Sequence, residues 1–450
     1  MKKFVFLAVV VCLAVAPAVF ADNYLVLFKG EGVPANFAAT VASLGGTVTS
    51  SHAAGIAAVS GLDAAGAAAL AANQAVADVQ PDAVFTLPAE TSAAAEQAYA
   101  DNVSASSAAN PAGAFFFARQ WDLRAIGANI GWAAGRRGNA GVTVAILDTG
   151  IDYKHADLNG RVDLSRSVSF IPGDDAIVAA LFPTRHPITD LQFHGTHVAA
   201  TVSSNALAAA GMTSGVTLIG VKVLDHNGSG PFSAIFNGIL WASDHGADVI
   251  NMSLGTDFPK AHEGQFLGFY NRIFNYANRK GALVVVAAGN DGIDLDHDGN
   301  NFNANCNAPN VVCVAATGPT FSPGINGPWT DVDAPAFYTN FGRSSISVAA
   351  PGGNLGATNT GGFVWEACST SSLAIPQCQT GTFVVGLIGT SQATPHVSGL
   401  AALLVEDIGH GKPSQVKARL QQTADDLGQA GTDPFYGKGR INVPRAEGLQ

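Results

Sequence analysis

Six mostly apolar runs alternate with helical patterns from Trp121 onward, and this alternation constrains the fold more than any other feature. The runs are Val142–Leu147, Ile219–Leu224, Val249–Met252, Leu283–Ala287, Val311–Ala315 and Ile346–Ala349. Between them, Phe232–His245 and Phe266–Lys280 carry apolar residues at helical spacing. Strands without a polar face are typical of parallel sheets that helices cover on both sides. We therefore predict an α/β fold with a mostly parallel sheet and helices on both faces.

Residues 23–87 carry a different pattern, which predicts a small α+β unit. Its expected order is β-α-β-β-α-β, the split βαβ (ferredoxin-like) arrangement. The expected elements are a strand at Tyr24–Phe28, a helix after Pro34, two strands in Thr47–Val59, a helix over Asp63–Asn73 and a closing strand at Ala83–Leu87. From Pro88 to about Gly113 the chain is rich in Ala and Ser, which predicts an exposed linker that is open to proteolysis.

The amino terminus predicts export. A basic start, Met1-Lys2-Lys3, precedes the apolar stretch Phe4–Val15, and Val19-Phe20-Ala21 offers small residues for cleavage after Ala21. A membrane anchor is disfavoured because the apolar stretch is short and is followed by a proline. We expect an extracellular protein, with the periplasm as the alternative. The net charge of −11 and the absence of Lys/Arg blocks argue against nucleic-acid and anionic-membrane partners.

Removal of the signal peptide leaves four cysteines, and an even number in an exported chain indicates two disulfides. We expect the pairs Cys306–Cys313 and Cys368–Cys378, because short loops lose the least entropy on closure. A zinc site is disfavoured, since the sequence contains no Cys-x-x-Cys pair.

Polar residues follow the apolar runs directly, at the sheet edge where α/β proteins place their sites. Asp148 follows the first run at once, Ser253 follows the third, and Asn290 comes soon after the fourth. Singly, each of these residues is more often structural than catalytic. Ser391 near a helix start is, by itself, most simply explained as a helix cap.

His194 and His197 begin a predicted helix, three residues apart. This spacing can place both rings on one face and so permits a metal site. No acidic residue stands at the spacing of a further ligand, so we favour His194 as a proton carrier and His197 as a packing residue.

Three segments together resemble the active-site motifs of the subtilases, the subtilisin-like serine peptidases. They are Asp148-Thr-Gly-Ile-Asp152, His194-Gly-Thr-His-Val198 and Gly389-Thr-Ser-Gln-Ala-Thr-Pro-His396. The resemblance extends from Gln120 to the carboxyl terminus and implies a subtilisin-like sheet. Residues 22–88 resemble, in topology and position, the inhibitory propeptide of these enzymes. The implied division is a signal peptide at 1–21, a propeptide at 22–88, a linker with the maturation region at 89–117 and a peptidase domain at 118–450.

The resemblance also implies the role of each site residue. Ser391 would be the nucleophile, His194 its general base and Asp148 the residue that orients His194. The side-chain amide of Asn290 and the Ser391 N–H would form the oxyanion hole. Substrate would pair as an extended strand with two edges, and Ala288 and Gly289 would help to wall the primary pocket. These edges are Gly228, Ser229 and Gly230 on one side and Ser253, Leu254 and Gly255 on the other.

The implied protein is a monomeric, propeptide-inhibited serine endopeptidase. Its partners would be protein or peptide substrates and its own propeptide, and catalysis would need no cofactor. The rival hypotheses are a catalytically silent binding protein on the same scaffold and a metal-dependent hydrolase that uses both histidines. A catalytically silent relative would be expected to lack a triad residue or the oxyanion asparagine. This sequence has all four.

The sequence departs from the family pattern at several places. Gln392 stands where the family usually has Met, and Ala200 where Gly is customary. Asn301 replaces a Gly at the floor of the primary pocket, which predicts small or medium side chains on the acyl side of the cleaved bond. Residues 352–386 are longer than needed to reach Ser391, and we expect a disulfide-tied surface insertion.

Two segments bear on structural calcium. Asp294, Asp296 and Asp298 open a calcium-loop pattern whose twelfth position is Asn305 rather than Glu, so that a solvated acidic loop is an equal alternative. Asp157 matches a carboxylate that often binds calcium in the family. Its partner loop, residues 205–210, is apolar, so we expect that second site to be lost.

Overall fold

The computed structural model describes residues 22–88, 91–92, 96–97, 108–254, 258–259, 266–297, 301–302, 304–354 and 360–449. The chain divides into two compact units, residues 1–81 and 82–450. The predicted signal peptide and the central part of the predicted linker lie outside the described residues. Among the helices that are described, none combines the length and the apolar character needed to cross a membrane.

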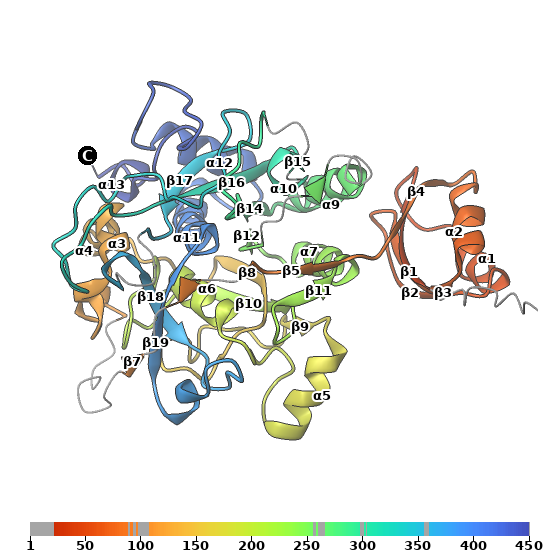
Figure 1. The fold of residues 1–450 in the computed structure, drawn as a ribbon, viewed down its shortest axis with the longest axis horizontal. Helices are drawn as coiled ribbons and strands as arrows, with labels where there is room; N and C mark the ends of the chain where they lie inside the picture. The colour runs from red at the N-terminus through yellow and green to blue at the C-terminus, as the bar shows by residue number, and fades with distance from the viewer. Residues whose placement is uncertain are drawn as a thin grey trace, which may run out of the picture. The chain divides into compact units, whose positions relative to one another are not determined.

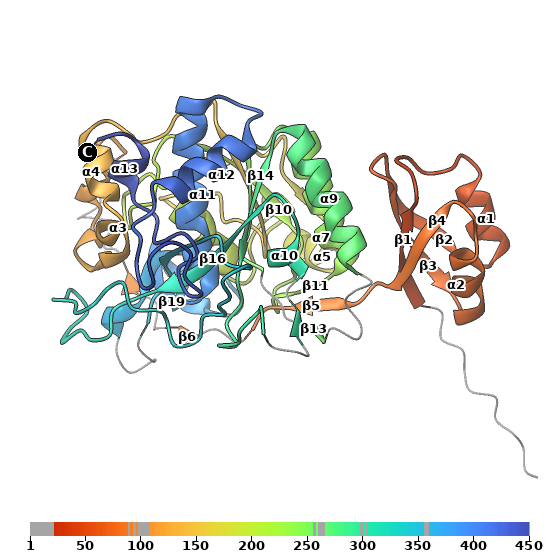
Figure 2. The same cartoon turned by 90° about the horizontal axis from the view of Figure 1, so that it is seen from above.

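The amino-terminal unit has the predicted β-α-β-β-α-β order. It comprises β1 (Asp22–Phe28), α1 (Phe37–Ser43), β2 (Thr47–His52), β3 (Ile56–Leu62), α2 (Ala64–Ala71) and β4 (Val76–Pro81). The strands form an antiparallel sheet in the order β2-β3-β1-β4. Both helices cover one face of this sheet (Figures 1 and 2), where Val26, Val41 and Leu70 are buried in a common core.

The sequence prediction placed the closing strand of this unit wrongly. The closing strand is β4, whereas β5 (Val84–Thr86) pairs with β11 (Ser229–Pro231) of the second unit. The segment Ala83–Leu87 is extended, as its apolar residues indicate, but periodicity does not identify the partner of a strand. The chain therefore enters the second unit at Asp82 rather than after Pro88.

The second unit is built on a seven-stranded sheet in which all neighbouring strands are parallel. Its order is β17 (Val348–Pro351), β16 (Val311–Thr317), β14 (Leu283–Ala287), β12 (Val249–Met252), β8 (Thr143–Asp148), β10 (Thr217–Lys222) and β9 (Val168–Ser169). All six predicted runs lie in this sheet, and the α/β prediction is confirmed. The edge strand β9 was not predicted, because two residues carry no periodic signal.

Helices cover both faces of this sheet. In Figures 1 and 2, α6 (His194–Val202) and α11 (Thr390–Ile408) lie on one face, and α7 (Phe232–Asp244) and α9 (Phe266–Lys280) lie on the other. The first sixteen residues of α11, Thr390–Val405, are all buried. The helix that begins beside Ser391 is therefore a central element of the core. Short helices α3 (Trp121–Ala125), α4 (Ala128–Ala133), α5 (Pro172–Leu181), α10 (Ala304–Asn307), α12 (Pro413–Gln422) and α13 (Val443–Ala446) complete the unit.

The predicted surface insertion is instead largely buried. Within it, β18 (Val364–Cys368) pairs antiparallel with β19 (Phe383–Ile388), and every residue of both strands is buried. The disulfides Cys306–Cys313 and Cys368–Cys378 both form as predicted. The second of these packs with Phe383 and with Phe193, the residue before His194. The segment that leads to Ser391 thus shares a small core with the segment that leads to His194.

The carboxyl end of the predicted linker also belongs to the core. Phe116 is buried, and its backbone N–H donates to the carbonyl of Ala208 at 2.8 Å. Pro111 begins a short 3-10 turn, η2 (Pro111–Gly113), and is buried as well. Any exposed linker therefore ends before Pro111.

Candidate active site

The three predicted triad residues lie at the starts and ends of buried elements. Asp148 is the last residue of β8, His194 is the first residue of α6, and Ser391 is the second residue of α11. All three side chains are buried. The two helices contact each other, and α6 also packs on β8. The fold thus brings these three chain segments to the carboxyl edge of the sheet, as expected for an α/β protein.

Asp148 and His194 form a buried hydrogen bond. The distance from Asp148 Oδ1 to His194 Nδ1 is 2.7 Å, and the same oxygen accepts the N–H of Thr149, also at 2.7 Å. A carboxylate at Nδ1 favours the tautomer that carries its proton there, which leaves Nε2 as the basic nitrogen. This half of the arrangement is therefore suited to accept a proton at Nε2.

Asp190 links the loop that carries Asp148 to the helix start that carries His194. The sequence did not predict this residue. Its carboxylate accepts the Thr149 hydroxyl at 3.0 Å, and the N–H and hydroxyl of Thr196 at 2.9 and 2.7 Å. Thr149 follows Asp148 and Thr196 lies two residues after His194, so one buried side chain ties both loops together. Burial raises the pKa of Asp190, and the Thr196 hydrogen bond and Lys222 oppose that rise. No local pattern marks this residue, because its partners lie on two separate segments.

Ser391 is held against the loop after β12. Its hydroxyl donates to the carbonyl of Ser253 at 3.1 Å, and the Ser253 hydroxyl donates to the carbonyl of Ser391 at 2.8 Å. The nucleophile candidate therefore lies directly beside one of the two predicted substrate edges. In this rotamer the hydroxyl uses an acceptor that an extended substrate would otherwise use.

Asn290 is oriented by the turn that precedes α11. Its Oδ1 accepts both the N–H and the hydroxyl of Thr390, each at 2.9 Å. This leaves Nδ2 at the other end of the carboxamide. A Cβ atom added to Gly389 would lie 3.5 Å from that Nδ2 and 3.6 Å from the backbone nitrogen of Ser391. Both predicted oxyanion donors thus lie near the position that a Gly389 side chain would take, and Gln392 Oε1, 2.7 Å from that position, leaves no room for one there.

One predicted substrate edge already carries a strand of this chain. In β11, Gly230 pairs with Phe85 and Ser229 with Thr86 of β5. Beyond the strand, the Leu87 N–H donates to the carbonyl of Gly228 at 2.9 Å, and the Phe232 N–H donates to the carbonyl of Ala83 at 3.0 Å. Phe85 is 3% exposed, so this strand also buries an aromatic side chain. This edge thus holds an extended segment of the chain through backbone pairing and buries its aromatic side chain.

A second extended segment pairs with β19, which leads to Ser391. Here β6 (Thr91–Ser92) pairs antiparallel with the end of β19, with Thr91 opposite Ile388 and Ser92 opposite Leu387. Farther along, β7 (Glu96–Gln97) pairs with the start of β19. The segment that joins the amino-terminal unit to the rest of the chain therefore pairs first with β11, through β5, and then with β19, through β6 and β7.

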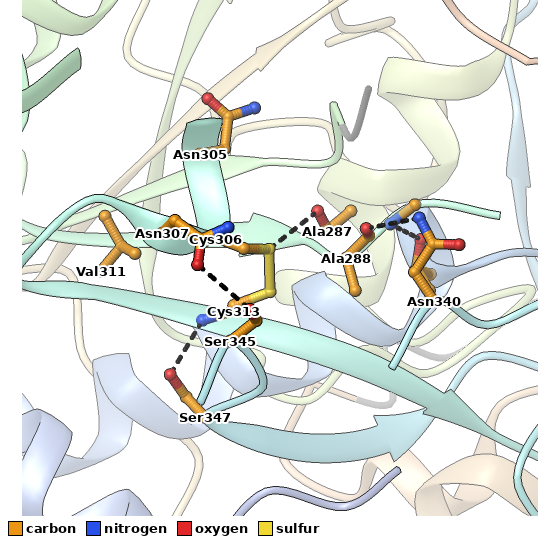
Figure 3. Close-up of a disulfide and its surroundings, with 12 residues drawn as sticks. Ala287, Ala288, Asn305, Cys306, Asn307, Val311, Cys313, Asn340, Ser345 and Ser347 are labelled. Atoms are coloured by element: carbon orange, nitrogen blue, oxygen red, sulfur yellow. Dashed lines mark hydrogen bonds between the residues drawn. A yellow bond between two sulfur atoms is a disulfide. The ribbon is translucent and has the colours of Figure 1, made fainter. Parts of the chain in front are cut away.

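A disulfide lies beside the predicted wall of the primary pocket, close to Ala287 and Ala288 (Figure 3). The Cys306–Cys313 bond joins α10 to β16, and Cys306 Sγ lies 3.9 Å from the carbonyl oxygen of Ala287. Asn305 Nδ2 donates to the carbonyl of Leu254 at 3.2 Å, which links α10 to the second substrate edge.

The structure describes only some of the other residues predicted to line the primary pocket. The carbonyl of Ala288 accepts Asn340 Nδ2 at 3.0 Å, and the Gly289 N–H donates to the Thr390 hydroxyl at 3.1 Å. Both predicted wall residues are thus tied to Asn340 and to the turn before Ser391. Gly255 lies outside the described residues. Asn301 belongs to β15 (Asn301–Phe302), which pairs with β13 (Phe258–Pro259), and the preference for small or medium side chains stays a prediction.

His197 does not share the role of His194. It is fully buried, and burial lowers its pKa to about 3. Its Nε2 lies 3.2 Å from the carbonyl oxygen of Val364 in β18, which accepts the N–H of the neutral ring. A ring that stays neutral and bonded to the backbone fits the predicted packing role.

The residues at Asp157 do not fit a calcium ion. One oxygen of its carboxylate accepts the N–H groups of Leu207 and Ala208, at 2.7 and 2.9 Å, and the other accepts that of Ala209 at 3.1 Å. Calcium is held by oxygen ligands, and N–H donors turned toward the carboxylate occupy its lone pairs instead. The backbone N–H groups of the apolar loop thus provide the hydrogen bonds of the Asp157 carboxylate.

In the acidic loop at residues 294–298, the described carboxylates accept hydrogen bonds from protein groups. Asp294 Oδ1 accepts the N–H of Asp296 at 3.0 Å. Asp296 in turn accepts the N–H of Ser344 at 2.8 Å and the hydroxyl of Ser345 at 2.9 Å. Asp298 lies outside the described residues. Within the described part of the chain, no group of three His, Cys, Asp or Glu side chains could hold a metal ion.

Comparison with known proteins identifies relatives of this arrangement. A sequence model of the subtilase family matches residues 139–439. The thermophilic serine proteinase of Bacillus sp. strain AK1 is 33% identical over 310 residues, which cover 68% of this chain and 61% of that protein. Thermitase of Thermoactinomyces vulgaris is 31% identical over 335 residues, which cover 74% of this chain and 97% of thermitase.

The solved structures extend the likeness of fold. The epidermin leader peptide processing serine protease of Staphylococcus aureus matches with a TM-score of 0.71, at 22% sequence identity. The match covers 95% of this chain and 98% of that one. At this identity the likeness concerns the fold alone, which is the subtilisin-like α/β fold that the sequence predicted.

Proposed function

This chain belongs to the subtilase family of serine peptidases, and from that premise we propose that it is a secreted endopeptidase made as a self-inhibited precursor. Ser391 attacks the carbonyl carbon of the substrate while His194 Nε2 accepts the hydroxyl proton. Asp148 keeps the His194 tautomer fixed and stabilises the imidazolium that forms. His194 then protonates the departing amine, which leaves an acyl-enzyme on Ser391 that water hydrolyses.

The observation that carries this proposal is the pair of N–H donors beside Gly389. Asn290 Nδ2 and the Ser391 nitrogen both lie near the side-chain position of Gly389, and Thr390 fixes the orientation of the Asn290 amide. Fixed donors of this kind stabilise the negative oxygen of a tetrahedral intermediate. A silent binding protein on this scaffold would have no use for them.

A serine-directed fluorophosphonate tests the proposal directly. The native protein, once cut free of its precursor segment, should be labelled at one site, and Ser391→Ala should not be labelled, because only an activated serine attacks the phosphorus centre. Labelling that persists in Ser391→Ala would contradict the assignment of the nucleophile. Activity that is lost to a chelator but not to the label would favour the metal-dependent alternative.

The pairing of β5 and β6 supports the precursor part of the proposal. β5 pairs with the edge at Gly228–Pro231, and β6 pairs with β19 so that Thr91 stands opposite Ile388, three residues before Ser391. Followed backward from Ser92 to Thr91, the chain runs along β19 toward Ser391. A strand that binds on both sides of the nucleophile blocks the cleft and presents the bond between them. We infer that maturation cuts a bond between Pro88 and Thr91.

The amino terminus of the mature enzyme tests this inference. Intact mass and amino-terminal sequencing should find that the mature chain begins at Ala89, Glu90 or Thr91, since the preceding bonds join the two paired strands. A mature chain that begins first at Ala108 or later, without an earlier cut, would contradict it. The Ser391→Ala precursor, purified from a host without other active peptidases, serves as the uncut reference.

The remaining parts of the proposal rest on family membership and on the disulfides. Two disulfides fit an oxidising compartment outside the cytosol. Backbone pairing at both edges fits protein or peptide substrates of varied sequence. Catalysis by this triad needs no cofactor.

A further inference from the structure

Gln392, which directly follows the nucleophile, is a buried amide that the core does not use. Its side chain is fully buried, and neither Nε2 nor Oε1 has a hydrogen-bond partner among the described residues. Burial of a polar group without a partner destabilises a folded protein. An amide retained in such a position therefore points to a partner that is present only when the protein works.

The amide faces the space beside Gly389. A Cβ atom at that glycine would lie 2.7 Å from Gln392 Oε1, as well as 3.5 Å from Asn290 Nδ2 and 3.6 Å from the Ser391 nitrogen. Gly389 has an extended backbone with φ of 166°, which any residue can adopt, so its lack of a side chain matters for space. Three polar groups therefore lie around Gly389, and two of them are the proposed oxyanion donors.

We propose that Gln392 is a third hydrogen-bond donor of the oxyanion hole. This inference rests on the proposed function, because the oxyanion exists only if Ser391 attacks a carbonyl group. In the free protein Oε1 is the end of the amide that lies nearer to Gly389, and it accepts no hydrogen bond from the described residues. When a negative oxygen fills the space, a half-turn of the carboxamide presents Nε2–H to it.

No hydrogen bond within the described residues opposes that half-turn. Its backbone is fixed, since its N–H donates to the Gly389 carbonyl at 3.0 Å and its carbonyl oxygen lies 2.8 Å from His396 Nδ1. His396 is held in turn by Asp122, at 3.0 Å. The terminal torsion of glutamine is broad, and no hydrogen bond within the described residues restrains it here. The main chain is thus rigid while the amide can turn.

Kinetics of Gln392→Met test the proposal, because methionine keeps the length of the side chain and removes the donor. A hydrogen bond to a charged group is worth about 10- to 100-fold in rate. We expect kcat to fall by about this factor with KM unchanged. A peptide aldehyde, which forms a tetrahedral adduct with Ser391, should bind more weakly by the same factor. The corresponding peptide alcohol forms no adduct and should bind equally well to both proteins.

Gln392→Glu provides a second variant with a different signature. The ionised carboxylate only accepts hydrogen bonds, so kcat should fall further than in Gln392→Met. Protonation restores a donor, so the ratio of native to Gln392→Glu kcat should shrink as pH falls. Gln415→Met, on the exposed face of α12, controls for the replacement itself. Thermal melting checks folding, and Gln392→Met should melt at or above the native temperature because it removes an unpaired amide.

These measurements separate the inference from the function on which it rests. If the native mature protein neither turns over peptide nor binds the aldehyde, the proposed function fails. If the native protein does both and Gln392→Met keeps its kcat and aldehyde affinity, only the role of Gln392 is overturned. A loss that appears in KM alone, with equal weakening of aldehyde and alcohol, would also overturn it.

Discussion

Ser391→Ala should lower kcat by about 10⁶-fold, the loss measured for the same change in subtilisin, and should leave the precursor uncut. Without the hydroxyl no acyl-enzyme forms, and only water bound beside the oxyanion donors can attack the carbonyl. The edges that pair with β5 and β6 stay intact, so both segments should stay bound. Intact mass should therefore show one chain that still carries the amino-terminal unit, with no turnover above background.

Ser398→Ala is the matched control for this change. It makes the same substitution on the same helix, and the lost hydroxyl donates to Asn251 Oδ1 at 2.7 Å rather than to any site residue. The control should lose about 1 kcal/mol of stability and should still mature. Mature-size product from purified Ser391→Ala, in a host without other peptidases, would show that another group cuts the precursor.

The sheet was predictable because its strands are buried on both faces. A parallel strand between two helical layers must be apolar at every position, which leaves a continuous run such as Leu283–Ala287. The edge strand β9 and the polar strand β4, which contains Asp78 and Gln80, carry no such run. Hence β9 was missed, and the apolar Ala83–Leu87 was assigned to the unit that β4 closes.

The disulfide-tied segment was misjudged for a different reason. Its length suggested an insertion, and two cysteines close together suggested a surface loop. The strand Phe383–Ile388 is apolar throughout, which is a signal for burial rather than exposure. Its role is positional, since the core around the Cys368–Cys378 bond includes Phe193 beside His194.

In the site, the residues that belong to short sequence motifs were predicted. The residues that hold them in place through hydrogen bonds were not. Asp148, His194, Asn290 and Ser391 each follow or open a recognisable element. Asp190 acts through Thr149 and Thr196, and Gln192 Oε1 accepts the N–H of His194 at 2.6 Å. Such contacts depend on how separate loops meet in space, and no spacing along the chain encodes them.

Asp148→Asn should lower kcat by about 10⁴-fold with little change in KM. Asparagine preserves the shape of the side chain but removes the charge that stabilises the imidazolium form of His194. Because the amide can also donate to Nδ1, it favours the tautomer whose proton blocks Nε2. The same Asp148 oxygen contacts both His194 Nδ1 and the Thr149 N–H, so an asparagine that turns its amide nitrogen toward Nδ1 loses the Thr149 hydrogen bond, and thermal melting should accompany the kinetics.

Asp190→Asn tests whether this effect belongs to the charge beside His194 or to buried carboxylates in general. Asp190 ties the same two loops through Thr149 and Thr196, and none of its hydrogen bonds within the described residues reaches the His194 side chain. Its replacement should therefore lower the melting temperature and should reduce kcat far less than Asp148→Asn does. Fluorophosphonate labelling adds a second readout: Asp148→Asn should slow labelling by a factor similar to that for kcat without abolishing it, because Ser391 remains. Native kcat in Asp148→Asn would reduce Asp148 to a structural residue and would leave His194 without an orienting partner.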